Sequence, residues 1–327
     1  MIIVRTPYRL SLLGGTSDYP EHFSKHGGAC LVSTINKFSY VSLRKLPPYF
    51  GHLTRAVWSK VETVYNNLEI EHPGINGSLR YLGLDDLGLE IHYDSDIPAR
   101  AGMGSSSAFI VGLLNGMWAL NGEGRAPAQM LAKTAIRVER EYVGDCVGVQ
   151  DQISTAYGGI NLVEIERSGA FQLYSTLRFR LAELESYLLL IFTNLTRHAS
   201  DIARQQIIDF HQHESTLKRF AEQAREGARI LCSSQPIEHF FWLLKEAWVL
   251  KRRLAAVTND HIDEMDRQIT DAGALACKLV GAGGGGFFLV AVSPEKRQDF
   301  LGHFPGAIWF PVQFHHGGSE VIFRNDG

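Results

Sequence analysis

The chain alternates between short runs with a strand-like pattern and longer runs typical of helices. Residues 89–94 alternate apolar and polar side chains, as a half-buried strand does, and residues 109–120 are mostly apolar, as in a buried helix. Between them, residues 98–108 are rich in glycine and serine. This order of strand, loop and helix directs free backbone N–H groups and the positive end of a helix dipole at the loop, which predicts an anion such as phosphate there.

The chemistry of this loop fits an anion. Gly102 and Gly104 allow the backbone to approach a ligand closely, and the hydroxyls of Ser105, Ser106 and Ser107 add hydrogen-bond donors or a metal ligand. A turn that only caps the following helix remains the alternative.

The same patterns predict elements along the rest of the chain. Strands are expected at residues 2–5, 7–13, 29–43, 160–165, 187–193, 287–292, 307–314 and 320–323. Helices are expected at residues 56–68, 127–142, 147–156, 200–232 and 263–279. No internal repeat or long linker interrupts them. We therefore expect an α+β protein of two domains, residues 1–180 and residues 181–327.

Composition narrows the function classes. With 327 residues, 45% hydrophobic and 20% charged residues and a formal net charge of -3, the chain is an ordinary globular protein. The charge gives no reason to expect nucleic acid. The four cysteines lie too far apart in sequence for a zinc knuckle or redox pair, which suggests reduced thiols. No signal peptide or membrane-spanning run is visible, so we expect no membrane association and a cytoplasmic location.

A second glycine-rich run covers residues 281–286 and formally has the spacing of a dinucleotide-binding fingerprint. That fingerprint needs a strand before it and a helix after it, whereas here we expect a helix through Lys278 and then a strand. Five glycines in six positions are costly to order. We therefore expect another backbone or a ligand to approach this run closely.

Three carboxylates lie in turns or on expected helices: Asp18, Glu139 and Asp151. Taken singly, each is more often a surface or capping residue than a functional one. Together with two glycine-rich loops they supply what phosphoryl transfer needs. One acid holds Mg²⁺, another lies near the accepting hydroxyl, and a polar turn orients the acceptor.

Three segments in the appropriate order resemble the GHMP superfamily of small-molecule kinases: residues 7–19, 98–108 and 278–286. The resemblance implies an N-terminal domain like ribosomal protein S5 and a ferredoxin-like C-terminal domain, with the active site in the cleft between them. It also implies ATP as phosphoryl donor, Mg²⁺ and a small-molecule acceptor; a homodimer is left open.

The resemblance also implies roles for individual residues. Asp151 matches the catalytic acid and Arg9 lies with it, while Ser106 and Glu139 match the Mg²⁺ ligands. ATP is expected on Arg100, Gly102, Gly104, Ser105, Ser106 and Ser107. The acceptor is expected on Gly14, Gly15, Thr16, Asp18, Gln152, Gly283 and Gly284.

The first segment departs from the Gly-Glu-His-Thr-Asp-Tyr of galactokinases, since residues 14–20 read Gly-Gly-Thr-Ser-Asp-Tyr-Pro. This form looks like the bacterial D-glycero-α-D-manno-heptose 7-phosphate kinases, which phosphorylate the anomeric hydroxyl on the way to activated heptose for surface polysaccharides. A sugar phosphate needs cations for its distal phosphate, and Arg197 and Lys251 are the candidates. A kinase for fucose, arabinose or galactose, and a non-catalytic sugar sensor, remain alternatives.

Overall fold

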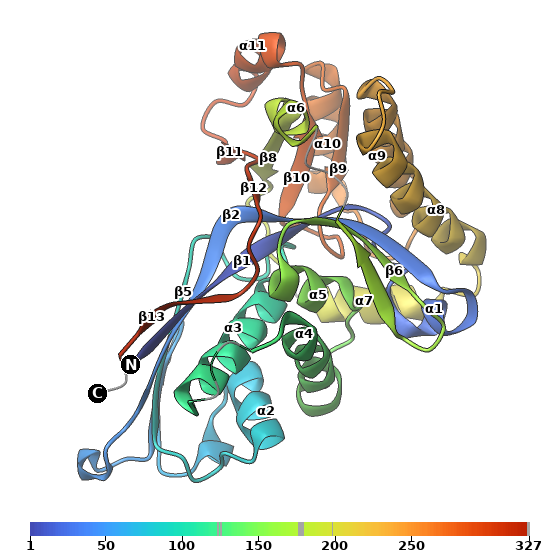
Figure 1. Ribbon diagram of the computed structural model, residues 1–327. Helices are drawn as coiled ribbons and strands as arrows, with labels where there is room; N and C mark the ends of the chain where they lie inside the picture. Colours follow the sequence, from blue (N-terminus) through green and yellow to red (C-terminus); the bar gives the residue numbers. More distant parts are fainter. Residues whose placement is uncertain (123, 125, 176–179, 198, 326–327) are drawn as a thin grey trace.

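Two long antiparallel strands form the centre of the larger sheet: β1 (Ile2–Leu13) and β2 (Gly28–Lys45). The β-branched and aromatic residues expected to form strand over residues 29–43 do so without a break at Asn36. We describe the computed structural model over residues 1–122, 124, 126–175, 180–197 and 199–325. Figure 1 shows the last strand, β13 (Glu320–Arg324), beside the first residues of β1.

The other strands of this sheet pair with β2 or extend its edges in the order β13-β1-β2-β5-β3-β4, with β12 and β6 also on β2 and β7 on β6. They are β3 (Thr54–Val57), β4 (Val61–Val64), β5 (Leu89–Ser95), β6 (Ile160–Ile165), β7 (Phe171–Tyr174), β12 (Phe314–His315) and β13 (Glu320–Arg324).

Helices cover both faces of this sheet (Figure 1). On one face lie α2 (Pro73–Leu82), α3 (Ser105–Leu120), α4 (Ala128–Arg137) and α5 (Gln150–Tyr157), and on the other lies α8 (Glu214–Leu231). Glycines at the contacts bring helix and sheet together: a Cβ at Gly116 of α3 would lie 2.3 Å from Leu43 Cδ1, and one at Gly227 of α8 would lie 2.5 Å from Leu13 Cδ1. The placement of α3 matters most, because the glycine-serine loop leads into it.

The smaller sheet has the order β11-β8-β10-β9, with every pair antiparallel. Its strands are β8 (Leu188–Phe192), β9 (Ala276–Leu279), β10 (Phe287–Ala291) and β11 (Trp309–Pro311). One hydrophobic core joins the two sheets, since Leu10 of β1, Leu190 of β8 and Leu289 of β10 belong to the same buried cluster. The predicted α+β class is therefore confirmed, and the two sheets share one hydrophobic core.

The remaining helices surround the smaller sheet or connect the elements. They are α1 (Pro20–His26), α6 (Leu181–Tyr187), α7 (Ala199–Ile208), α9 (Glu238–Lys251), α10 (Asp260–Asp271) and α11 (Arg297–Gly302), with short helical turns η1 (Pro48–Phe50), η2 (Asn67–Glu69), η3 (Val138–Val143) and η4 (Pro294–Lys296). Among the helices of the described residues, none combines the length and apolar character that crossing a bilayer requires.

Two predicted helices are wrong in whole or in part. Residues 56–68 form β3, β4 and η2, because burial alternates along β3 and that strand pairs in parallel with β5. The helix expected over residues 263–279 ends at Asp271, and Gly273 then turns the chain with φ +93°. Residues 276–279 are strand β9, whose side chains are all buried. Residues 281–286 therefore connect two strands, which excludes the dinucleotide fingerprint for lack of a following helix.

Three other predicted elements are divided in the structure. Residues 200–232 form α7 and α8, and residues 127–142 form α4 followed by the π-helix η3. Residues 307–314 separate into β11, which pairs with β8, and the start of β12, which pairs with β2. The last of these breaks lets one run of sequence pair with both sheets. The boundary at residue 180 stays a proposal, and residues 176–179 before it lie outside the described part.

Candidate active site

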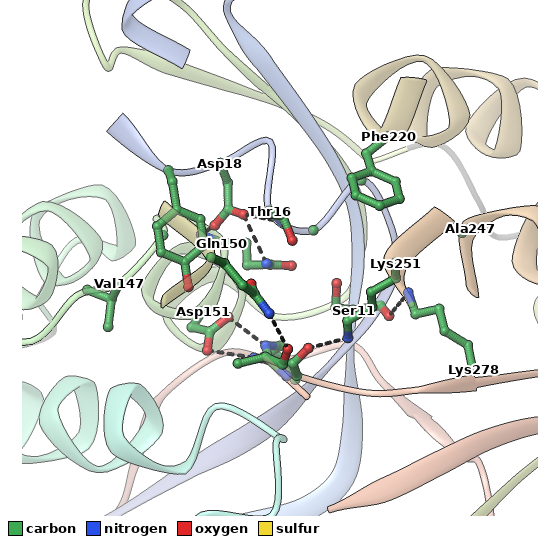
Figure 2. Close-up of a pocket in the computed structure, with 18 of the residues that line it drawn as sticks. Ser11, Thr16, Asp18, Val147, Gln150, Asp151, Phe220, Ala247, Lys251 and Lys278 are labelled. Carbon is green, nitrogen blue, oxygen red and sulfur yellow. Dashed lines mark hydrogen bonds and ion pairs between the residues drawn. The ribbon is translucent and has the colours of Figure 1, made fainter. Parts of the chain in front are cut away.

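A cavity lies where the turn after β1, the start of α5, α9 and the β9–β10 connection meet. Figure 2 shows two walls of different charge: Asp18, Gln150 and Asp151 lie on one, and Lys251 and Lys278 lie on the other. Its lining also includes residues of the first sequence motif, namely Arg9, Ser11, Gly14, Gly15 and Thr16. Segments more than a hundred residues apart in sequence thus form one site.

Arg9 and Asp151 form a two-pronged ion pair at this cavity. Arg9 Nε donates to Asp151 Oδ1 at 2.6 Å, and Arg9 Nη2 donates to Asp151 Oδ2 at 2.7 Å. The third prong, Nη1, donates to the carbonyl of Gly102 at 2.6 Å. Arg9 is buried, whereas Asp151 retains exposure to the cavity. The guanidinium therefore fixes the carboxylate beside the glycine-serine loop.

Asp18 is fully buried and accepts hydrogen bonds from four N–H groups. Its Oδ1 accepts from the backbone of Thr16 at 3.0 Å and from Gln150 Nε2 at 3.1 Å. Its Oδ2 accepts from the backbone of Val149 at 2.9 Å and of Gln150 at 3.1 Å. Burial raises the pKa of Asp18, while these N–H groups act in the opposite direction. Asp18 thus lines the cavity and also ties the first motif to the beginning of α5, which carries Asp151.

Glu139 lies away from the cavity lining, in the π-helix η3, and is fully buried. Ser107 Oγ donates to its Oε2 at 2.8 Å, and Gln152 Nε2 donates to the same oxygen. Its Oε1 has no hydrogen-bond partner among the described residues. Burial raises the pKa of Glu139 to about 7. Gln152, expected to contact the acceptor, is instead buried against this carboxylate.

These oxygens fit a magnesium ion. A carboxylate with an unpartnered oxygen and neighbouring serine hydroxyls offers the hard oxygen ligands that Mg²⁺ prefers, together with nucleotide phosphates and water. Within the described residues no three His, Cys, Asp or Glu side chains cluster as a metal site. A metal here would therefore depend on Glu139, on Ser106 or Ser107, and on a nucleotide.

The glycine-serine loop ends at the N-terminus of α3, as expected. Gly104 has φ +71° immediately before Ser105, and Gly102 and Arg100 also adopt positive φ values of +74° and +65°. The first N–H groups of a helix have no partner within the helix, so those at residues 105–107 point toward the loop. The backbone of Arg100 donates to Ser105 Oγ at 3.2 Å, which closes the loop on itself. The loop has the form of an anion cradle.

The glycine-rich connection of residues 281–286 packs against this loop. A Cβ at Gly281 would lie 2.5 Å from Gly102 Cα, and one at Gly286 would lie 2.4 Å from the carbonyl of Ala101. The expectation that another backbone approaches these glycines closely is confirmed. Gly281 lines the cavity, whereas Gly283 and Gly284 pack against Val257 and Ile202 and lie outside its lining.

Lys278 was missed as a site residue from sequence, although it is the one charged residue of β9. It lines the cavity together with Lys251, and both side chains are more than nine-tenths buried. Burial lowers the pKa of Lys278 to about 7, and the charge of Arg9 acts in the same direction. Burial also lowers the pKa of Lys251, and the charges of Lys278 and Arg9 add to that shift. Arg197, the other predicted cation, is exposed and outside the cavity lining.

Comparisons with known proteins find similarity to small-molecule kinases. A family model described as "GHMP kinases N terminal domain" matches residues 64–159. The chain is 28% identical, over 92% of its own length and 92% of the relative's, to D-glycero-alpha-D-manno-heptose 7-phosphate kinase of Campylobacter jejuni. It is 26% identical, over 91% and 90%, to galactokinase of Pyrococcus furiosus. A crystal structure named D-glycero-D-manno-heptose 1-phosphate kinase, from Bacteroides thetaiotaomicron, superposes with a TM-score of 0.81 at 22% identity, covering 99% of this chain and 100% of that one.

Proposed function

Because the chain carries a GHMP kinase N-terminal domain and the fold of those kinases, we propose that it is an ATP-dependent sugar kinase whose acceptor is D-glycero-D-manno-heptose 7-phosphate. The observation that carries the proposal is the Arg9–Asp151 pair, which places a carboxylate at a cavity beside the anion cradle. The choice of heptose is supported by similarity to the Campylobacter jejuni enzyme over nearly the whole of both chains. Transfer to the anomeric hydroxyl would give the 1,7-bisphosphate.

The donor phosphates lie on the loop of residues 100–107 in this proposal. Backbone N–H groups at the start of α3 bind the phosphate oxygens, and the helix dipole favours their negative charge. When bound between Glu139, Ser106 or Ser107 and the nucleotide, Mg²⁺ would neutralise charge that develops during transfer. Ser107 and Gln152 hold the Glu139 carboxylate in a fixed orientation.

Asp151 acts on the acceptor hydroxyl. It accepts a hydrogen bond from that hydroxyl, orients the oxygen toward the terminal phosphate and takes its proton as transfer proceeds. Arg9 fixes the orientation of the carboxylate and balances its charge. General-base assistance of this kind contributes about 10²- to 10⁴-fold, and the remaining acceleration comes from positioning and charge neutralisation.

The first-motif turn supplies contacts for the sugar. Gly14, Gly15 and Thr16 line the cavity beside Asp18. Such a polar wall recognises hydroxyl groups, and a site built to bind a hydroxyl rejects sugars that lack it. Gln152 supports Glu139 in this account and does not contact the sugar.

One other acceptor class is favoured by a specific observation. The similarity to the Pyrococcus furiosus galactokinase covers nearly the same length at 26% identity, so a kinase for an unphosphorylated sugar is the second candidate. A non-catalytic sugar sensor is less well supported, because a binder has no need of a carboxylate held beside the cradle.

The test is ADP release with Mg-ATP against heptose 7-phosphate, mannose 6-phosphate, free heptose, galactose, fucose and no sugar. Phosphorus NMR of the product identifies the phosphorylated carbon. Turnover that is fastest on heptose 7-phosphate, with a new phosphate at the anomeric carbon, supports the proposal. Turnover only on an unphosphorylated sugar would instead favour the second candidate, a kinase for a free sugar.

A further inference from the structure

Lys251 at the end of α9 and Lys278 in β9 present two buried ammonium groups to one cavity. Lys251 Nζ donates to the carbonyls of Leu279, at 2.9 Å, and of Gly281. Lys278 Nζ donates to the carbonyls of Ser11, at 3.0 Å, and of Leu12, at 2.6 Å. Both side chains are thus anchored by the backbone, which fixes where each nitrogen lies.

Each lysine Nζ keeps one hydrogen-bond donor that a ligand could use. An ammonium group has three N–H donors. Two of them are used on carbonyls at each lysine, so each retains one that has no acceptor among the described residues. Two such donors at the same cavity match an acceptor with several oxygens.

The positive charges of Lys251 and Lys278 are also not balanced by a carboxylate of the described residues. Neither lysine forms an ion pair with a carboxylate of the described residues. The acids at the opposite wall are already engaged, since Asp151 is paired with Arg9 and Asp18 accepts four N–H groups. A buried cation without a counter-ion is costly unless a ligand supplies the charge.

We propose that Lys251 and Lys278 form a subsite for a dianionic phosphate ester at the end of the acceptor opposite its reacting hydroxyl. The inference rests on the proposed function for the identity of the sugar, and it adds the residues that select a phosphorylated acceptor over a free one. Asp151 and the two lysines lie on different sides of the cavity (Figure 2), so the subsite is separate from the carboxylate that meets the reacting hydroxyl.

Protonation links the subsite to its ligand. Burial and the positive charge of Arg9 hold the pKa of Lys278 at about 7, whereas the Cys30 thiol acts in the opposite direction. Burial also lowers the pKa of Lys251, and the positive charges of Lys278 and Arg9 act in the same direction. A dianion between these groups favours their charged forms. Binding at alkaline pH is therefore accompanied by uptake of protons from solvent.

The first experiment compares acceptors in Lys278→Met and Lys251→Met. We expect the preference for the phosphorylated acceptor, measured as the ratio of kcat/KM for heptose 7-phosphate to kcat/KM for free heptose, to fall about 10²-fold or more in each variant, mainly through KM for heptose 7-phosphate. Lys245→Met is the matched control, because Lys245 lies on the exposed side of α9 and serves no part of the site. An equal loss on both sugars would overturn the phosphate role and assign the lysines to structure.

The second experiment uses the wild-type protein, so it needs neither a correctly folded variant nor catalytic turnover. Calorimetric binding of mannose 6-phosphate and of mannose is measured at pH 8.5, in buffers of different ionisation enthalpy, with the nucleotide site saturated by Mg-ADP. We expect proton uptake with mannose 6-phosphate and none with mannose. Binding of both sugars without proton uptake, or failure of mannose 6-phosphate to bind more tightly than mannose, would refute the subsite.

The two proposals fail in different ways. If free heptose is turned over as fast as heptose 7-phosphate, and Lys278→Met does not change this, the subsite is refuted while the sugar kinase assignment stands. Proton-linked binding of mannose 6-phosphate without phosphoryl transfer to any sugar would keep the subsite and remove the kinase assignment.

Discussion

Asp18 accepts hydrogen bonds from the backbone N–H groups of Val149 and Gln150 and therefore fixes the start of the helix that carries Asp151. The resemblance to sugar kinases assigns Asp18 to the sugar alone. In the structure its carboxylate links the first motif to α5, and this link determines where α5 holds Asp151.

Replacing Asp18 therefore changes both stability and catalysis. Asp18→Asn puts an amide NH₂ where N–H donors converge, and we expect the free energy of unfolding to fall by about 1–3 kcal/mol. Because α5 loses an anchor, kcat falls along with acceptor affinity. Urea denaturation and steady-state kinetics measure the two effects. Asp94→Asn, at an exposed position of β5, is the control, and an equal stability for both variants would contradict the anchoring role.

Glu139 is expected to determine the response to magnesium. Glu139→Gln removes the charge next to the unpartnered oxygen, so the Mg²⁺ concentration for half-maximal activity should rise about 10- to 100-fold. A magnesium titration at fixed ATP measures it. Glu141→Gln is the control in the same π-helix, because Glu141 forms an exposed ion pair with Arg137 on the protein surface. The assignment fails if both variants keep the wild-type magnesium response.

The contact between Gly281 and Gly102 is expected to position the anion cradle. Gly281→Ala adds a Cβ that would lie 2.5 Å from Gly102 Cα, so the loop must move and KM for ATP should rise. Gly273→Ala is a matched control, since Gly273 has φ +93° and nothing within 4 Å of such a Cβ. In the control, the only added cost is the backbone strain of alanine at positive φ, about 1 kcal/mol or more of stability. Equal effects of both variants on KM for ATP would contradict the packing argument.

The stability of the protein should depend on pH through Lys278. Its pKa is about 7 in the folded chain, whereas an unfolded lysine titrates near about 10.4. Between these values the unfolded chain binds the proton and the folded chain does not, so this residue makes the free energy of unfolding rise with pH. Urea denaturation at pH 7, 8 and 9 should show the wild type gaining stability relative to Lys278→Met. If the two proteins keep the same difference in free energy of unfolding from pH 7 to pH 9, Lys278 is charged over that whole range.

Much of the site could be predicted from local sequence. The glycines and serines of residues 98–108, with the apolar run that follows, predict a loop between a strand and a helix. The structure has this strand, loop and helix. The approach of a backbone to residues 281–286 also follows from glycine content, because side chains would fill that space. Such features depend on a few neighbouring residues.

Features that depend on tertiary pairing could not be predicted in this way. Residues 56–68 have enough apolar spacing for a helix, yet pairing with β5 makes the first part a strand. Gln152 follows Asp151 directly, but helix geometry turns it toward Glu139 and away from the cavity. Lys278 carries a recognisable signal, a single charge within an otherwise apolar strand, although its partners come from residues near position 11.

We expect Asp151 to assist phosphoryl transfer to a heptose phosphate. The most direct measurement is a rapid-quench, single-turnover experiment with labelled Mg-ATP and heptose 7-phosphate, comparing wild type with Asp151→Asn. We expect transfer to the anomeric oxygen, about 10²- to 10⁴-fold slower in the variant, with nucleotide affinity retained. Transfer at the wild-type rate in Asp151→Asn, or wild-type protein that binds both ligands and transfers nothing, would contradict it.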